Sequence, residues 1–131
     1  MTVHSFAEGI SVGVSFASTM EFGVFIAMAV ILIAGIFAGW LMGLLAWLVT
    51  AAQETISRIF IIWIITATIG ILHLPHSIAG NVEVLFGLLI STEIGFIDYV
   101  QFLTMATIGN VLGGAIFVGL LKYSHVIRGA E

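Results

Sequence analysis

Two histidines and a proline interrupt an apolar run in the middle of this chain, where residues 72–81 read LHLPHSIAGN. Hydrocarbon offers no water to the backbone groups that a broken helix leaves open. Such a break therefore persists only where it lines a cavity or is buried in protein. An ionisable residue at membrane depth indicates a binding or conduction site by default. Because imidazole exchanges a proton near neutral pH, His76 is the first candidate site residue.

The histidines also allow two other interpretations. In a structural role, His73 and His76 would satisfy backbone carbonyl groups that Pro75 frees. A metal site would need a third ligand, for which Glu83 is the nearby candidate. The chain has no HxxxH or HExxH spacing and no cysteine, so we predict no metal site. No nucleophile–base pair is visible, and we expect no enzyme activity, no catalytic residue and no cofactor.

Asn110 is a second polar residue deep in an apolar run. An unsatisfied amide in hydrocarbon costs several kcal/mol, so its side chain must be hydrogen-bonded. The partner is either a backbone carbonyl of a neighbouring helix or the backbone freed at the break after Pro75. The second alternative would join the two polar centres of the chain.

The composition shows which elements must position these residues. The chain is 61% hydrophobic and 8% charged, with a mean hydropathy of +1.27. A soluble domain of 131 residues could not bury that much apolar surface, so we predict an integral membrane protein in a lipid bilayer. Seven acidic residues against three basic ones do not form a nucleic-acid surface, and we expect no such partner.

Charge-free runs divide the chain into helices long enough to cross a membrane. We predict an all-α protein with three transmembrane helices, of which the middle one is broken. The spans cover about residues 22–52, 57–92 and 99–123, with the break at 72–81. Each span exceeds the roughly 20 residues that cross hydrocarbon.

The basic residues predict the orientation. Arg58 follows the first span, and Lys122 and Arg128 follow or end the third, so all three fall on one side. By the positive-inside rule this side, with the C-terminus, is cytoplasmic. The transmembrane domain is thus expected at 22–131. The segment 1–21 is expected not to span, and a loop, a surface-lying segment and part of a lost element are all open for it.

Glycines recur every four residues in two of the predicted spans. Gly35, Gly39 and Gly43 share one helix face, as do Gly109 and Gly113. Such spacing lets neighbouring helix backbones approach closely. We predict tight packing within a bundle or oligomer, and a backbone wall of a narrow pore is a compatible alternative.

Taken together, the two polar centres resemble the formate/nitrite transporter family. The matching pieces are His76-Ser77-Ile78-Ala79 at the break, Gly109-Asn110 with Gly113-Gly114 in the third span, and residues 35–47, which are similar to the fourth span of the family. The resemblance implies the second half of an aquaporin-like six-span inverted repeat, in a protomer with its own pore. It also implies a multi-pass protein of the cell (inner or plasma) membrane that assembles as a homo-oligomer, namely a pentamer.

The resemblance further implies a substrate path for small monovalent anions. Ser77 belongs to the matching motif, and Ile69 falls where the family has a bulky gate residue. Gly80 stands where the well-known formate channels carry asparagine, and Asn81 follows one residue later. The first half of the repeat has no counterpart, except that residues 9–16 are faintly similar to the start of the first span. A chain supplying the missing half is therefore an alternative partner.

An anion crossing hydrocarbon needs fixed dipoles or neutralisation, because desolvating a bare carboxylate is very costly. Half-helix ends at the break supply dipoles. Our hypothesis is that His76 hydrogen-bonds a weak-acid anion and lends it a proton, while Asn110 holds His76 or the broken backbone in place. The alternative is a truncated half-length membrane protein that has a structural or partner role and no transport activity.

Overall fold

A computed structural model describes residues 20–92, 94–120 and 123–124. All regular secondary structure in this part of the chain is helical, as the sequence predicts. Most of the expected N-terminal segment 1–21 lies outside the described residues, as do Lys122 and Arg128, on which the predicted orientation depends. The elements are α2 (Met20–Ala51), α3 (Thr55–Ile71), α4 (Ala79–Ile90), α5 (Phe96–Val111) and the π-helix η1 (Leu112–Val118).

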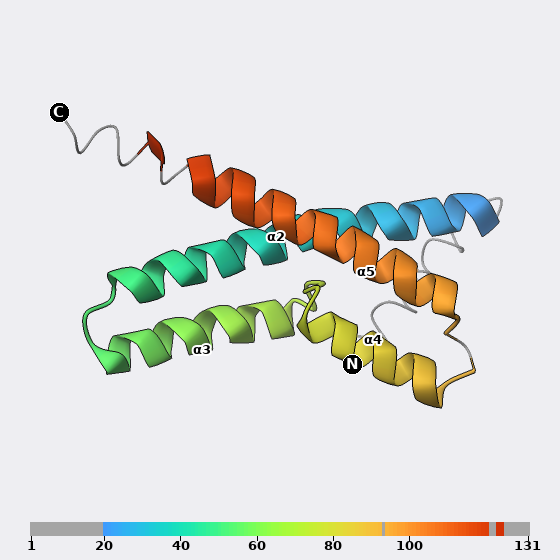
Figure 1. The fold of residues 1–131 in the computed structure, drawn as a ribbon, viewed down its shortest axis with the longest axis horizontal. Helices are drawn as coiled ribbons and strands as arrows, with labels where there is room; N and C mark the ends of the chain where they lie inside the picture. The colour runs from blue at the N-terminus through green and yellow to red at the C-terminus, as the bar shows by residue number, and fades with distance from the viewer. Residues whose placement is uncertain (1–19, 93, 121–122, 125–131) are drawn as a thin grey trace.

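The helices form two crossed layers around the break. α2 runs the length of the molecule, and α5 crosses it and continues into η1 (Figure 1). α3 and α4 follow one another on the same side of this crossed pair, with the break between them near the middle (Figure 1). α3 packs against α2, whereas α4 packs against α5. The two halves of the interrupted segment are therefore held by different partners.

Within the described part of the chain, two helical stretches are long and apolar enough to cross a membrane, namely Phe22–Ala51 and Phe96–Ile116. α3 and α4 have 17 and 12 residues, which is less than the roughly 20 that one crossing needs. Large apolar side chains are exposed along all of the helices. In water such a surface would drive association, whereas it is what a helix presents to lipid.

Capping hydrogen bonds determine where α2 ends and where α5 begins. The pattern of charges in the sequence does not show these two positions. Arg58 donates from Nε and Nη2 to the carbonyl of Ala52, at 3.0 and 2.9 Å, just after α2 ends. At the start of α5, the N–H of Gly95 donates to Oδ2 of Asp98 at 2.9 Å. α5 thus begins at Phe96 rather than at 99, because a capping carboxylate lies inside the first turn of a helix.

Glycines bring the backbones of α2 and α5 into contact, as their spacing predicts. A Cβ atom added at Gly39 would collide with the backbone of Asn110. One added at Gly113 would collide with the carbonyl of Ile36. We call this contact between α2 and the α5–η1 helix the glycine seam. Its close approach fixes the height and rotation of Asn110 relative to α2.

After Val111 the third expected span changes from α-helix to the π-helix η1. The sequence predicts a regular helix here, because apolar periodicity does not distinguish the two forms. π-Helical turns are rare and frequently lie at functional sites. This one begins two residues after Asn110 and contains Gly113 and Gly114.

Candidate functional site

The break begins where a left-handed residue ends α3. His73 has a positive φ of 49°, a conformation that histidine adopts more readily than most residues other than glycine. Its N–H donates to the carbonyl of Gly70 at 3.2 Å, and the N–H of Leu74 donates to that of Ile69 at 3.0 Å. These bonds form a Schellman motif, after which Pro75 prevents the helix from continuing. His73 therefore has a clear structural role.

The middle of the break is held by the side chain of Asn110. Its Nδ2 donates to the carbonyls of Gly35 and Pro75, at 3.0 Å each. Its Oδ1 accepts from the N–H of Ser77 at 3.0 Å and from the Ser77 hydroxyl at 3.2 Å. Both partners considered for Asn110 are thus present, a neighbouring helix and the broken backbone. The four bonds use the full capacity of the amide, so Asn110 is a positioning residue.

The break ends between His76 and Ala79, where α4 begins, and His76 accepts hydrogen bonds from the backbone there. The carbonyl of His76 accepts from the N–H of Gly80 at 2.8 Å. Its Nδ1 accepts from the N–H groups of Ile78 and Ala79, at 3.3 and 3.4 Å. This is the hydrogen-bond pattern of a helix N-cap residue. Because Nδ1 is the acceptor in both bonds, they require an unprotonated Nδ1, with the ring proton on Nε2.

Histidine is an unusual choice for this capping role. Serine, asparagine and aspartate are the residues that cap helix N-termini well, and they do so with shorter side chains. The local fold thus needs an acceptor at position 76 but not an imidazole. What histidine adds is the Nε2–H group, which no described hydrogen bond of the protein uses.

Two hollows meet at His76. One, of about 260 Å³, is lined by His76 together with Ile69, Gly80, His73 and Glu83. Three of these residues were predicted for the substrate path. Glu83 was considered only as a metal ligand, although it is the one charged residue between Arg58 and Glu93 in the sequence. The isolation of this charge in the sequence is the signal that could have identified Glu83 as a candidate site residue.

The other hollow, of about 340 Å³, lies on the Asn110 side of the break. It is lined by His76, Ser77 and Asn110, with Thr107 of α5 among the further residues. His76 is the only predicted site residue that lines both hollows. The structure therefore brings the five predicted residues to one place but divides them between two sides of His76.

Gly80 lines the hollow and is also required to be small by the packing of α4 on α5. A Cβ atom at Gly80 would lie 2.7 Å from Cζ of Phe102, a buried ring in the core between α4 and α5. The next residue, Asn81, accepts a hydrogen bond from the hydroxyl of Tyr99 at 2.6 Å. Position 80 is thus glycine because Phe102 occupies the space beside it.

The electrostatics of the break favour an anion. α4 begins at Ala79, three residues after His76, and a helix amino end carries a partial positive charge. Half-helix ends of this kind face anionic groups in membrane transporters. Among the described residues, no three histidine, aspartate or glutamate side chains are grouped so that they could hold a metal ion.

Comparison with known proteins identifies a family and a curated relative. The sequence model of the formate/nitrite transporter family matches residues 2–124. The "Uncharacterized transporter YrhG" of Bacillus subtilis (strain 168) is 31% identical over 93 residues, which is 71% of this chain and 35% of that protein. The chain thus spans about a third of the length of this curated relative. No solved structure matches the chain.

Proposed function

Because this chain belongs to the formate/nitrite transporter family, we propose that it carries small monovalent anions, such as formate or nitrite, across the cell membrane. The path passes the break between α3 and α4. Ile69 and Gly80 line its approach on one side of His76, and Ser77 lines it on the other. Asn110 holds the broken backbone open by its four hydrogen bonds.

In this proposal His76 acts through the N–H of Nε2, which donates a hydrogen bond to the anion. We propose that the ring binds the anion without lending its own proton. Protonation at Nδ1 would replace the acceptor that caps Ile78 and Ala79. It would also place a positive charge against the positive end of α4. Both effects favour the neutral ring, which binds an anion without transferring a proton.

One observation carries the proposal: an imidazole accepts hydrogen bonds from the backbone at the start of α4, where a smaller residue would serve the fold better. The two flanking hollows give its Nε2–H group access to a ligand of a few atoms. An anion there would gain the hydrogen bond and the dipole of α4 in place of the water it loses.

We further propose that α3 and α4 form one interrupted crossing, so that the chain makes three crossings with its C-terminus in the cytoplasm. Three such crossings are half of a six-span inverted repeat. The exposed apolar faces of the four helices are compatible with the further contacts that a homo-oligomer or a second chain would make. The complete pore forms within that assembly.

Uptake of radiolabelled formate and nitrite into proteoliposomes tests the proposal. We expect His76→Phe to lower the flux by about tenfold or more, because the donor to the anion is lost. Trp63→Phe is the matched control, since Trp63 is an exposed aromatic residue of α3 outside both hollows. Unchanged flux of every small acid in His76→Phe would remove His76 from the mechanism.

A further inference from the structure

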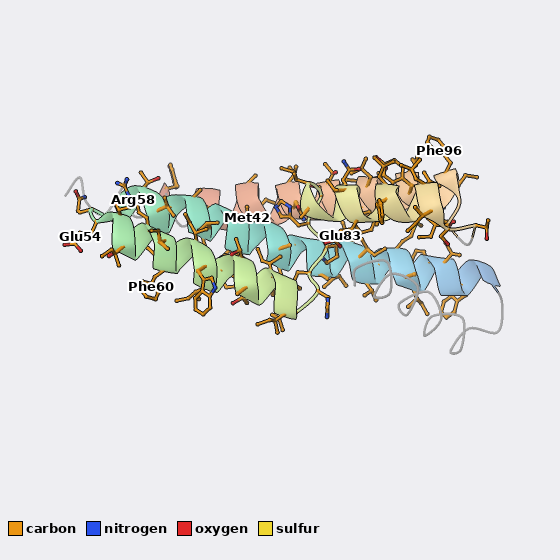
Figure 2. The ribbon with its side chains drawn as sticks, turned by 90° about the horizontal axis from the view of Figure 1, so that it is seen from below. Met42, Glu54, Arg58, Phe60, Glu83 and Phe96 are labelled. Atoms are coloured by element: carbon orange, nitrogen blue, oxygen red, sulfur yellow. The ribbon has the colours of Figure 1, made fainter. Side chains whose placement is uncertain are left out.

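Glu83 is an isolated charge at the depth of the break. It is the single charged residue between Arg58 and Glu93, and it lies on α4 among large exposed apolar side chains. Figure 2 shows Glu83 near the middle of the molecule, whereas Glu54 and Arg58 lie together at one end. A carboxyl group at membrane depth is expensive to keep and indicates a functional role.

The fold brings this carboxyl group to the hollow of His76. Glu83 follows Ala79 and Gly80 by four and three residues, so the three share one face of α4. All three line the same 260 Å³ hollow as His76. No hydrogen bond within the described residues requires Glu83 for the fold, unlike His73, which ends α3 by its backbone.

The chemistry of His76 leaves a task for a second group. A weak acid crosses hydrocarbon far more easily as the neutral acid than as the anion. His76 is held neutral by its capping bonds, so it binds the anion but has no proton to spare. A proton must then come from another group that borders the same space.

We propose that Glu83 is this proton donor, and the proposal rests on the transport function assigned above. The carboxylic acid of Glu83 gives its proton to an anion hydrogen-bonded to Nε2 of His76. The O–H bond of Glu83 breaks and an O–H bond of the substrate acid forms, which leaves a Glu83 carboxylate and a neutral acid. The carboxylate then takes up a proton from the aqueous phase on the side from which the anion entered, so one anion and one proton cross together.

Other titratable groups near α4 do not compete for this task. α5, which packs against α4, contributes Asp98 and Tyr99. Asp98 accepts from the Gly95 N–H, Tyr99 donates to Asn81, and neither lines the hollow. From the break, His73 lines the hollow and is the remaining ionisable neighbour. The substitution His73→Asn tests this neighbour, because asparagine also adopts the left-handed conformation that His73 has.

The test compares Glu83→Gln and Glu83→Asp with the wild type in proteoliposomes that contain the whole protein. A formate gradient drives flux, and a pH-sensitive dye inside reports the accompanying protons. Glu54→Gln is the matched control, because Glu54 is an exposed glutamate in the turn between α2 and α3. Each variant is measured at about pH 5.5, where the bulk solution supplies protons readily, and at about pH 7.5, where protons are scarce.

We expect Glu83→Gln to lower the formate flux about tenfold at the higher pH and less at the lower pH, where water supplies protons more readily. Glu83→Asp should recover part of the flux, while Glu54→Gln keeps the wild-type pH profile. A pH profile lost in His73→Asn but kept in Glu83→Gln would assign the proton to His73 and overturn the proposal. Wild-type flux and pH profile in Glu83→Gln, with flux lost in His76→Phe, would overturn the donor role and leave the transport function standing. Absence of flux for every small acid in the wild type would overturn both.

Discussion

The glycine seam and the break are opposite solutions to building a helical membrane protein. At the seam, α2 and α5 touch through backbone atoms, because glycines such as Gly39 and Gly113 leave no room for a side chain. At the break, the backbone is open, and hydrogen bonds and two hollows take the place of packing. The seam holds the fold together, whereas we propose that the break carries the chemistry.

Asn110 belongs to both regions. Its backbone packs on Gly39 in the seam, and its amide reaches the backbone of Pro75 and Ser77 in the break. A polar group can be held at membrane depth only if every bond it needs is met. The seam meets this condition by setting where the amide lies. Rigid packing is thus what permits an open segment nearby.

The largest effect in this comparison is expected at the seam. Gly39→Val would drive a branched side chain into the backbone of Asn110, and backbone cannot move aside as a flexible side chain can. We expect a loss of more than about 3 kcal/mol, or failure to fold, measured as a lower melting temperature in detergent. Gly119→Ala is the control, because a Cβ there meets nothing within 4 Å. A folded Gly39→Val variant with wild-type melting would refute the seam.

A smaller effect is expected where the two regions join. Asn110→Leu keeps the backbone contact but leaves the carbonyls of Gly35 and Pro75 and the N–H of Ser77 without their partner. Unsatisfied buried groups cost about 1–3 kcal/mol each, so we expect a net loss of about 2 kcal/mol together with loss of formate flux. Thermal melting and proteoliposome uptake measure the two. Full flux in Asn110→Leu would show that the amide does not hold the break.

The smallest effect is expected at the edge of the break, at His73. His73→Gly should raise stability by up to about 1 kcal/mol, since glycine adopts a positive φ without strain. His73→Val should lower it by about 1–2 kcal/mol, because a β-branched residue is strained there. Melting of the two variants side by side gives the sign of each change. Equal stability would contradict the Schellman motif as the end of α3.

The position of the break was predictable from Pro75 and its two histidines, because hydropathy and proline report directly on helix continuity. The close approach of α2 and α5 was predictable from glycine spacing for a similar reason. The orientation of each polar group was not. Asn110 had two candidate partners in the sequence, and only the crossing of α2 and α5 shows that one amide reaches both.

Other features left no usable signal in the sequence. The π-helix η1 depends on how the helix packs after Asn110, and its apolar residues fit an α-helix equally well. The role of Nδ1 of His76 as an acceptor depends on two backbone N–H groups that point at it, which spacing alone does not reveal. Glu83 could have been noticed as an isolated charge, but its place beside His76 required the turn of the chain at the break.

The central claim is that the imidazole of His76 serves transport and not the fold, and His76→Ser tests it most directly. Serine caps a helix well, but its hydroxyl group cannot reach the position that Nε2 of His76 occupies. The measurement is the melting temperature and formate flux of the same purified variant beside the wild type. We predict an unchanged melting temperature with flux lowered by about tenfold or more. Wild-type flux, or a loss of flux that only accompanies a loss of stability, would contradict the account.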